Sequence, residues 1–127
     1  MATSLVAAPS DQRRLIRVLA WAACLCALAI AFRHLVIEFQ PVASLCMEST
    51  VPWWCGIREF VIQTFYSDAV GIMSLGMGLA ALLLGGRRTG YIWAIAAIIW
   101  ASPSIVLYSA DYAVPAFLLG LLRLLRP

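Results

Sequence analysis

The sequence contains no lysine, a single histidine and few charged residues of any kind. Charged residues make up 12% of the 127 residues, about half the share of a typical soluble domain, whereas 64% of the residues are hydrophobic. This composition excludes an intrinsically disordered chain and argues against a soluble globular domain. The nine basic residues are all arginines and are scattered along the chain, which excludes nucleic-acid binding. We therefore expect an integral membrane protein.

The sequence motifs of common enzymes are also missing. Gly-x-Ser-x-Gly, His-Glu-x-x-His, the P-loop and the Rossmann glycine pattern do not occur. A lone histidine cannot ligate haem from both sides, and Cys24 and Cys26, two residues apart on a helix, point in nearly opposite directions and cannot share a metal. We expect no catalytic residue, no cofactor and no metal, and the sequence does not support a quinone or pigment contact.

Apolar runs predict an all-α integral membrane bundle with four transmembrane helices in a single domain, residues 1–127. Residues 15–32 alone cover roughly 27 Å at about 1.5 Å per residue, close to the thickness of a hydrocarbon core. A signal peptide cleaved after 27–29 is the alternative for this first run. The expected segments are a cytoplasmic leader (1–14), a first span (15–39), an outer loop (40–67), a second span (68–85), an inner turn (86–90), a third span (91–110) and a fourth span (113–127). The fourth is short, so it either crosses a thinned bilayer or lies in the interface.

The arginines predict the orientation of these helices. With the N-terminus in the cytoplasm, only Arg33 and Arg58 lie on the outer side. The remaining arginines then lie on the inner side: Arg13, Arg14, Arg17, Arg87, Arg88, Arg123 and Arg126. By the positive-inside rule, both termini are expected in the cytoplasm, and we expect a multi-pass protein of a bacterial inner membrane.

Two cysteines in the outer loop predict a disulfide. Cys46 and Cys55 lie on the outer side in this topology, which is an oxidising compartment in a bacterium. A bridge between them would stabilise the chain by roughly 2.5–3 kcal/mol in the chain-entropy model. The run that follows, 57–65, places apolar residues at helical spacing with charged residues between them, which predicts a short amphipathic helix at the membrane surface.

Polar residues gather where the first span ends. Arg33, His34 and Glu38 stand within six positions of one another, and the spacing of His34 and Glu38 is one helical turn. We expect an interfacial polar cluster here. A proton relay, a quinone contact or a pigment ligand is the functional alternative for His34.

Small residues recur at steps of three and four along the spans. In the second span these are Gly71, Ser74, Gly78, Ala81 and Gly85. The third span repeats the pattern with Ala94, Ala97, Ala101 and Ser104, and the first with Ala20, Ala23, Ala27 and Ala31. Small faces let helix backbones approach closely in lipid, so these residues are expected at helix contacts, either within the bundle or with a partner's helices.

The function expected from these features is that of a small, non-catalytic accessory or assembly subunit of a larger bacterial inner-membrane complex, for example a respiratory or photosynthetic one. Its expected partners are other membrane subunits and lipids. In topology the chain resembles the disulfide-bond formation protein B and vitamin K epoxide reductase families, four-helix bundles with outward cysteines. Those families use a close cysteine pair and a second pair on a loop, whereas here Cys46 and Cys55 are widely spaced. A membrane thiol–disulfide oxidoreductase is thus the alternative, and a small channel or carrier is the third.

Overall fold

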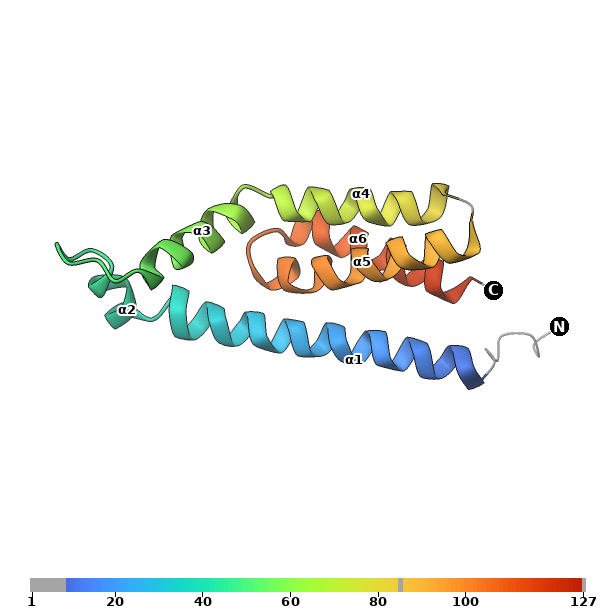
Figure 1. Ribbon diagram of the computed structural model, residues 1–127, viewed down its shortest axis with the longest axis horizontal. Helices are drawn as coiled ribbons and strands as arrows, with labels where there is room; N and C mark the ends of the chain where they lie inside the picture. The colour runs from blue at the N-terminus through green and yellow to red at the C-terminus, as the bar shows by residue number, and fades with distance from the viewer. Residues whose placement is uncertain (1–8, 85, 127) are drawn as a thin grey trace.

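The computed structural model describes residues 9–84 and 86–126, and this part of the chain is all-helical, without strands. The expected all-α class is therefore confirmed. Figure 1 shows the helices in order: α1 (Pro9–Phe32), the π-helix η1 (Arg33–Ile37), α2 (Gln40–Leu45), α3 (Trp54–Tyr66), α4 (Ala69–Leu83), α5 (Arg87–Val106) and α6 (Ala110–Leu125).

Helices α4, α5 and α6 form a tight three-helix bundle, and α1 lies alongside α5 (Figure 1). Glycine permits the close approach at two crossings. A Cβ on Gly78 would lie 3.2 Å from the carbonyl oxygen of Ala116, and a Cβ on Gly71 would lie 3.0 Å from the Cβ of Ser109. Backbones this close gain dispersion contacts that bulkier residues would prevent, which is the main source of helix association in lipid.

Helix α1 contacts α5 through a heptad pattern. Its inward residues recur at steps of three and four, and Ala22 and Ala29 among them are buried. The others are half-buried, namely Leu15, Val18, Leu25 and Phe32, and Val36 of η1 continues the pattern. This is the spacing that keeps one side of a helix against its partner. The alanines expected at the contact (Ala20, Ala23, Ala27 and Ala31) are all exposed, so that prediction is wrong for the contacts within this chain. The alanines that α1 does bury are Ala22 and Ala29, which alternate with larger half-buried residues.

Several segment boundaries differ from those expected. Residues 9–14 of the expected leader belong to α1, and residues 1–8 lie outside the described part. The expected inner turn 86–90 is shorter, because α5 begins at Arg87. The outer loop 40–67 contains two helices, α2 and the 13-residue α3, since Pro41 fixes the first turn of α2 and the apolar run after Cys55 continues to Tyr66.

By length and composition, two helices of the described chain could cross a membrane: the continuous segment Pro9–Ile37 and α5. Helices α3 and α4 bend by 52° at their junction and together could form a third, broken span. The bend lies at Asp68, whose φ of 59° is in the left-handed region and therefore ends the regular helix. Tyr108, with φ of 66°, makes a similar break between α5 and α6 at the same end of the bundle.

Candidate functional site

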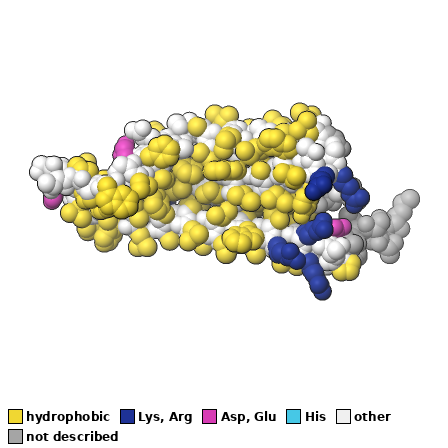
Figure 2. All heavy atoms as spheres, viewed as in Figure 1, with side chains coloured by type: hydrophobic (Ala, Val, Ile, Leu, Met, Phe, Trp, Pro, Cys, Tyr) yellow, Lys and Arg dark blue, Asp and Glu magenta, His cyan; other side chains and the backbone are white. Residues whose placement is uncertain are grey.

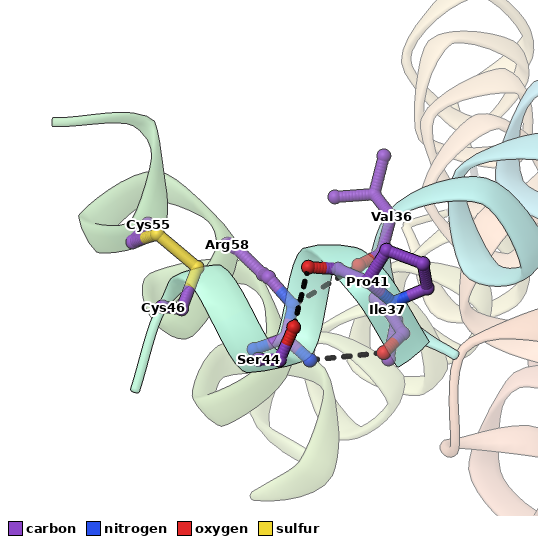
Figure 3. The surroundings of a disulfide bond; sticks show 7 residues. All are labelled: Val36, Ile37, Pro41, Ser44, Cys46, Cys55 and Arg58. Atoms are coloured by element: carbon purple, nitrogen blue, oxygen red, sulfur yellow. Dashed lines mark hydrogen bonds between the residues drawn. A yellow bond between two sulfur atoms is a disulfide. The ribbon is translucent and has the colours of Figure 1, made fainter. Parts of the chain in front are cut away.

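Cys46 and Cys55 form a disulfide at the tip of the molecule that α2 and the start of α3 make (Figure 3). Their sulfurs are 2.01 Å apart, and they join the end of α2 to the first turn of α3. Cys55 is only 6% exposed. A partner thiolate must reach a disulfide sulfur in line with the S–S bond, so burial of Cys55 limits attack at its sulfur, whereas Cys46 is half-buried. The bond acts here as a link between two short helices.

Arg58, one turn after Cys55, fastens this tip to the end of the first helix. Its Nε donates to the carbonyl oxygen of Val36 at 3.0 Å and its Nη2 to that of Ile37 at 2.9 Å (Figure 3). The last carbonyls of a helix have no partner within the helix, and a cation there also favours the helix dipole. The sequence shows Arg58 as an outward arginine but gives no sign of this role, because its partners are backbone atoms more than 20 positions away.

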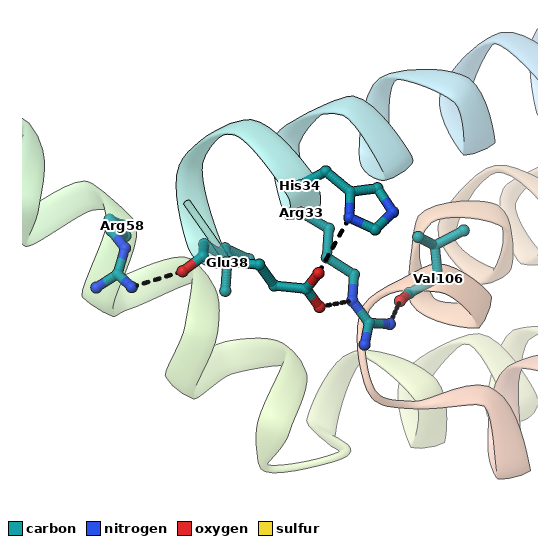
Figure 4. A network of polar contacts seen from close by, with 6 residues as sticks. Arg33, His34, Glu38, Arg58 and Val106 are labelled. Atoms are coloured by element: carbon teal, nitrogen blue, oxygen red, sulfur yellow. Dashed lines mark hydrogen bonds and ion pairs between the residues drawn. The ribbon is translucent and has the colours of Figure 1, made fainter. Parts of the chain in front are cut away.

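Arg33, His34 and Glu38 come together as one cluster (Figure 4). Arg33 Nε lies 2.6 Å from Glu38 Oε1, and His34 Nδ1 lies 3.0 Å from Glu38 Oε2. The π-helix makes this possible: the backbone N–H of Glu38 donates to the carbonyl of Arg33, five residues earlier, so the wide turn brings both side chains to one carboxylate.

Two partners of this cluster were not foreseen from the sequence. Arg33 Nη1 donates to the carbonyl oxygen of Val106, the last residue of α5, at 2.8 Å. The Arg33 guanidinium carbon also lies 5.0 Å from the ring centroid of Tyr108, within the range of a cation–π contact. Through Arg33 the cluster thus joins the first helix to the turn between α5 and α6. His34 is exposed, and its Nδ1 pairs with Glu38.

The ion pair changes the acidity of Glu38, which follows the last residue of the segment Pro9–Ile37. The hydrogen bond donated by Arg33 favours the ionised carboxylate and holds the pKa of Glu38 below its ordinary value. Partial burial opposes this shift, and the charges of Arg33 and His34 support it. Glu38 therefore stays ionised at neutral pH and keeps Arg33 directed toward Val106.

A second polar link joins the two left-handed turns of the bundle. Ser109 Oγ donates to the carbonyl oxygen of Phe65 at 2.6 Å, and the rings of Tyr66 and Tyr108 meet edge to face with centroids 6.2 Å apart. Ser109 is fully buried. This link fixes the end of α3 to the start of α6, and hence the tip of the molecule to the bundle.

At the opposite end Arg123 performs a similar role. Its Nε donates to the carbonyl oxygen of Ala81, near the end of α4, at 3.0 Å. The side chain lies over Gly90, where a Cβ would come within 2.7 Å of the Arg123 Nε. Arg33, Arg58 and Arg123, the capping arginines, thus each bind carbonyls at the C-terminal end of another helix. Each guanidinium supplies hydrogen-bond donors and a positive charge to the C-terminal end of a helix, where carbonyls lack partners within the helix.

The small residues of the second span face the bundle. Gly71, Ser74, Gly78 and Ala81 are all buried, and Ser74 Oγ bonds the carbonyl oxygen of Gly71 at 2.7 Å. Gly85 lies outside the described residues. The corresponding residues of α5 are buried as well: Ala94, Ala97, Ala101 and Ser104. These two faces serve contacts within the chain, whereas the small face of α1 does not.

Within residues 9–84 and 86–126, no group of three or more His, Cys, Asp or Glu side chains could hold a metal ion. Every buried side-chain nitrogen and oxygen in this part has a hydrogen-bond partner. No protein-family model, no curated protein and no solved structure matches the chain.

Proposed function

We propose that the chain is a small, non-catalytic accessory or assembly subunit of a larger complex in the bacterial inner membrane. It crosses the membrane four times in this proposal, through the segment Pro9–Ile37, α4, α5 and α6, with both termini in the cytoplasm. Helix α6 has 16 residues and covers roughly 24 Å, which fits a locally thinned bilayer.

The distribution of charge supports this topology. Figure 2 shows a group of arginines at one end of the molecule, where α1 and α5 begin and α6 ends, whereas Arg33 and Arg58 belong to the other end. The described residues at that end hold one acid, Asp11, whereas the other end holds Glu38, Glu48, Glu59, Asp68 and Asp111. Arginines on the cytoplasmic side are the strongest determinant of orientation. Reporter fusions after Arg88 and at the C-terminus should both be cytoplasmic, and a periplasmic signal at the C-terminus would mean that α6 does not cross.

The observation that carries the subunit proposal is the exposed face of α1, which packs against no other helix of the described chain. The inward heptad residues attach α1 to α5, and α1 makes no comparable contact with α4 or α6. Ala20, Ala27 and Ala31 lie on the opposite side of the helix and are exposed. Alanines spaced in this way allow another helix to approach closely, and association in lipid depends on such packing. A helix of another subunit is the occupant that we propose.

The chemistry of the polar residues also supports a structural role. The capping arginines bind helix ends, the disulfide links two helices, and the buried serines bond backbone carbonyls. A channel or carrier would need polar groups along a path through the bundle. The oxidoreductase alternative would need an accessible sulfur and a mechanism that lowers its pKa, and Cys55 is buried.

Purification in mild detergent tests the proposal. The wild-type chain should co-purify with defined partners in a fixed ratio, and Ala27→Leu should lose them while remaining folded and monodisperse. Gly76→Leu is the matched control, because Gly76 has no atom near its side-chain position and lies on α4. The subunit proposal is wrong if the wild-type chain migrates alone, or if Ala27→Leu and Gly76→Leu retain the same partners.

A further inference from the structure

The cytoplasmic end of α1 combines exposed arginines with an exposed apolar track. Arg13, Arg17, Trp21, Cys24 and Leu28 follow one another at steps of three and four, so they form one line along the helix, which we call the outward stripe. All five are exposed, and Trp21 and Leu28 are each 67% exposed, among the most exposed large apolar side chains of the chain. The stripe thus begins with two arginines and continues with three apolar residues.

No anionic group within the described chain pairs with the two arginines of the stripe. Arg13 and Arg17 form no ion pair and no side-chain hydrogen bond in the described residues, where the salt bridges involve only Arg33, His34 and Glu38. Asp11 is the one acid near them, and it precedes Arg13 by two positions, so it projects from the other side of the helix. The stripe therefore offers two unpaired guanidinium groups, one helical turn apart, to an external anion.

The dimensions of the stripe match a phospholipid. From Arg17 to Leu28 the helix rises by about 17 Å, close to half of a hydrocarbon core of about 30 Å. A phosphate bound at Arg13 and Arg17 would thus have its acyl chain beside Trp21 and Leu28 down to the middle of the bilayer. Guanidinium groups bind phosphate oxygens in pairs of parallel hydrogen bonds, and the chain uses arginine alone as its cation.

We propose that the outward stripe binds an anionic phospholipid, with the phosphate at Arg13 and Arg17 and an acyl chain along Trp21 and Leu28. This inference deepens the proposed function and rests on its membrane location. The stripe adjoins the partner face, since Arg17 and Ala20, and Leu28 and Ala31, are each three positions apart, but Trp21 and Leu28 project to one side of the line of alanines. It does not require a partner subunit.

Fluorescence quenching by brominated lipids tests the site in bilayers that contain the full chain alone. Brominated phosphatidylglycerol in unlabelled phosphatidylcholine is compared with brominated phosphatidylcholine in unlabelled phosphatidylglycerol, at equal fractions of brominated lipid. The difference between the wild type and Trp21→Phe isolates the signal of Trp21 from the other tryptophans. Stronger quenching of Trp21 by the anionic lipid is expected, because that lipid is enriched at the stripe.

Two double variants of equal charge locate the binding. Arg13→Gln with Arg17→Gln should lower the relative binding constant for the anionic lipid by up to about thirtyfold at low ionic strength. Arg87→Gln with Arg88→Gln removes the same charge from the same end of the molecule, at the start of α5, and should change it by less than about threefold. Equal losses in both variants would overturn the proposal, because attraction would then belong to the whole basic end.

Two further outcomes would also overturn it. If inorganic phosphate abolishes the preference and potassium chloride of equal ionic strength does not, the stripe binds free phosphate and not a lipid. If quenching shows no preference, and the Arg13, Arg17 variant loses a protein partner in detergent, the stripe is a protein contact. Loss of partners in Ala27→Leu with lipid preference intact would leave this inference standing, so the two proposals can fail separately.

Discussion

Gly120 of α6 lies directly against Ile98 of α5: a Cβ on Gly120 would lie 2.9 Å from the Ile98 Cγ1. Ile98 is the largest fully buried side chain of the described chain. The same Cβ would lie 2.9 Å from the carbonyl oxygen of Ala94, one turn earlier on α5. The crossing of α5 and α6 is thus set by the absence of a side chain on one helix and the bulk of a side chain on the other.

Gly120→Ala should therefore destabilise the bundle, although alanine is the better helix former. The added methyl must displace Ile98 or the backbone of α5, which costs about 1–3 kcal/mol. Gly76→Ala is the control, since no atom lies within 4 Å of its new Cβ and alanine gains up to about 1 kcal/mol in a helix. Thermal unfolding in detergent should give a lower midpoint for the first variant only. Similar midpoints would show that α5 and α6 are not packed this closely.

The contacts of the second and third spans illustrate what a sequence can reveal. Spacing alone placed Gly78 and Ala97 on helix faces that pack, and both are buried. In α1, however, alanines stand on both sides of the helix, and the pattern favoured the side of Ala20 and Ala27, which is exposed, over that of Ala22 and Ala29, which is buried. Hydrophobic periodicity gives the faces of a helix, but which face meets a neighbour depends on the volumes of both helices.

The polar contacts could be predicted from the sequence only where the partners are close along the chain. Arg33, His34 and Glu38 are close in sequence, so a cluster was predictable. The carbonyls that Arg33, Arg58 and Arg123 bind belong to distant helices, at separations of 73, 22 and 42 positions. Backbone acceptors have no sequence signature, and the π-helix that aligns Arg33 with Glu38 has none either. Such contacts follow from tertiary structure alone.

Removal of the two hydrogen bonds that Arg58 donates should destabilise the tip locally without unfolding the bundle. In Arg58→Gln the carbonyls of Val36 and Ile37 lose their donors, and hydrogen bonds to charged groups contribute about 1.5–3 kcal/mol each. Hydrogen exchange of residues 36–60 should accelerate, while α5 and α6 stay protected. Glu59→Gln changes an exposed neighbour and serves as the control. Unchanged exchange in Arg58→Gln would contradict this role.

Glu38 should make the stability of the junction between η1 and α2 depend on pH. Its pKa in the folded chain lies below its value in an unfolded chain, so its stabilising contribution is present above the unfolded pKa and is lost as pH falls through the folded one. On acidification below about pH 4.5, the wild type should lose part of its advantage over Glu38→Gln. Unfolding in detergent at several pH values measures this, with Glu48→Gln as the control. A constant difference between wild type and Glu38→Gln would refute it.

The cysteines should divide into two pairs by thiol chemistry. Cys46 and Cys55 are bonded, whereas Cys24 and Cys26 are free, and Cys26 donates its S–H to the carbonyl of Ser102. Denatured, unreduced protein should take up two alkylating groups, and reduced protein should take up four. Mass spectrometry counts them. Four groups without reduction would show that the tip lacks its disulfide.

The final prediction separates a structural disulfide from a catalytic one. A catalytic pair must pass through a mixed disulfide, in which one sulfur is attacked by a partner's thiolate and the other leaves. In Cys55→Ser the remaining Cys46 would trap such a partner covalently. We expect no trapped partner, because Arg58, the nearest arginine in the sequence, donates to the carbonyl oxygens of Val36 and Ile37, and Cys55 is buried.

The double change of Cys46 and Cys55 to serine completes this test. It should lower the stability of the tip by roughly 2.5–3 kcal/mol, the contribution of closing a loop of this length. Disulfide formation in other envelope proteins should continue unchanged in cells that carry the double variant. A trapped mixed disulfide in Cys55→Ser, or an accumulation of reduced envelope proteins with the double variant, would favour an oxidoreductase, since a bond that only links α2 to α3 has no effect on other proteins.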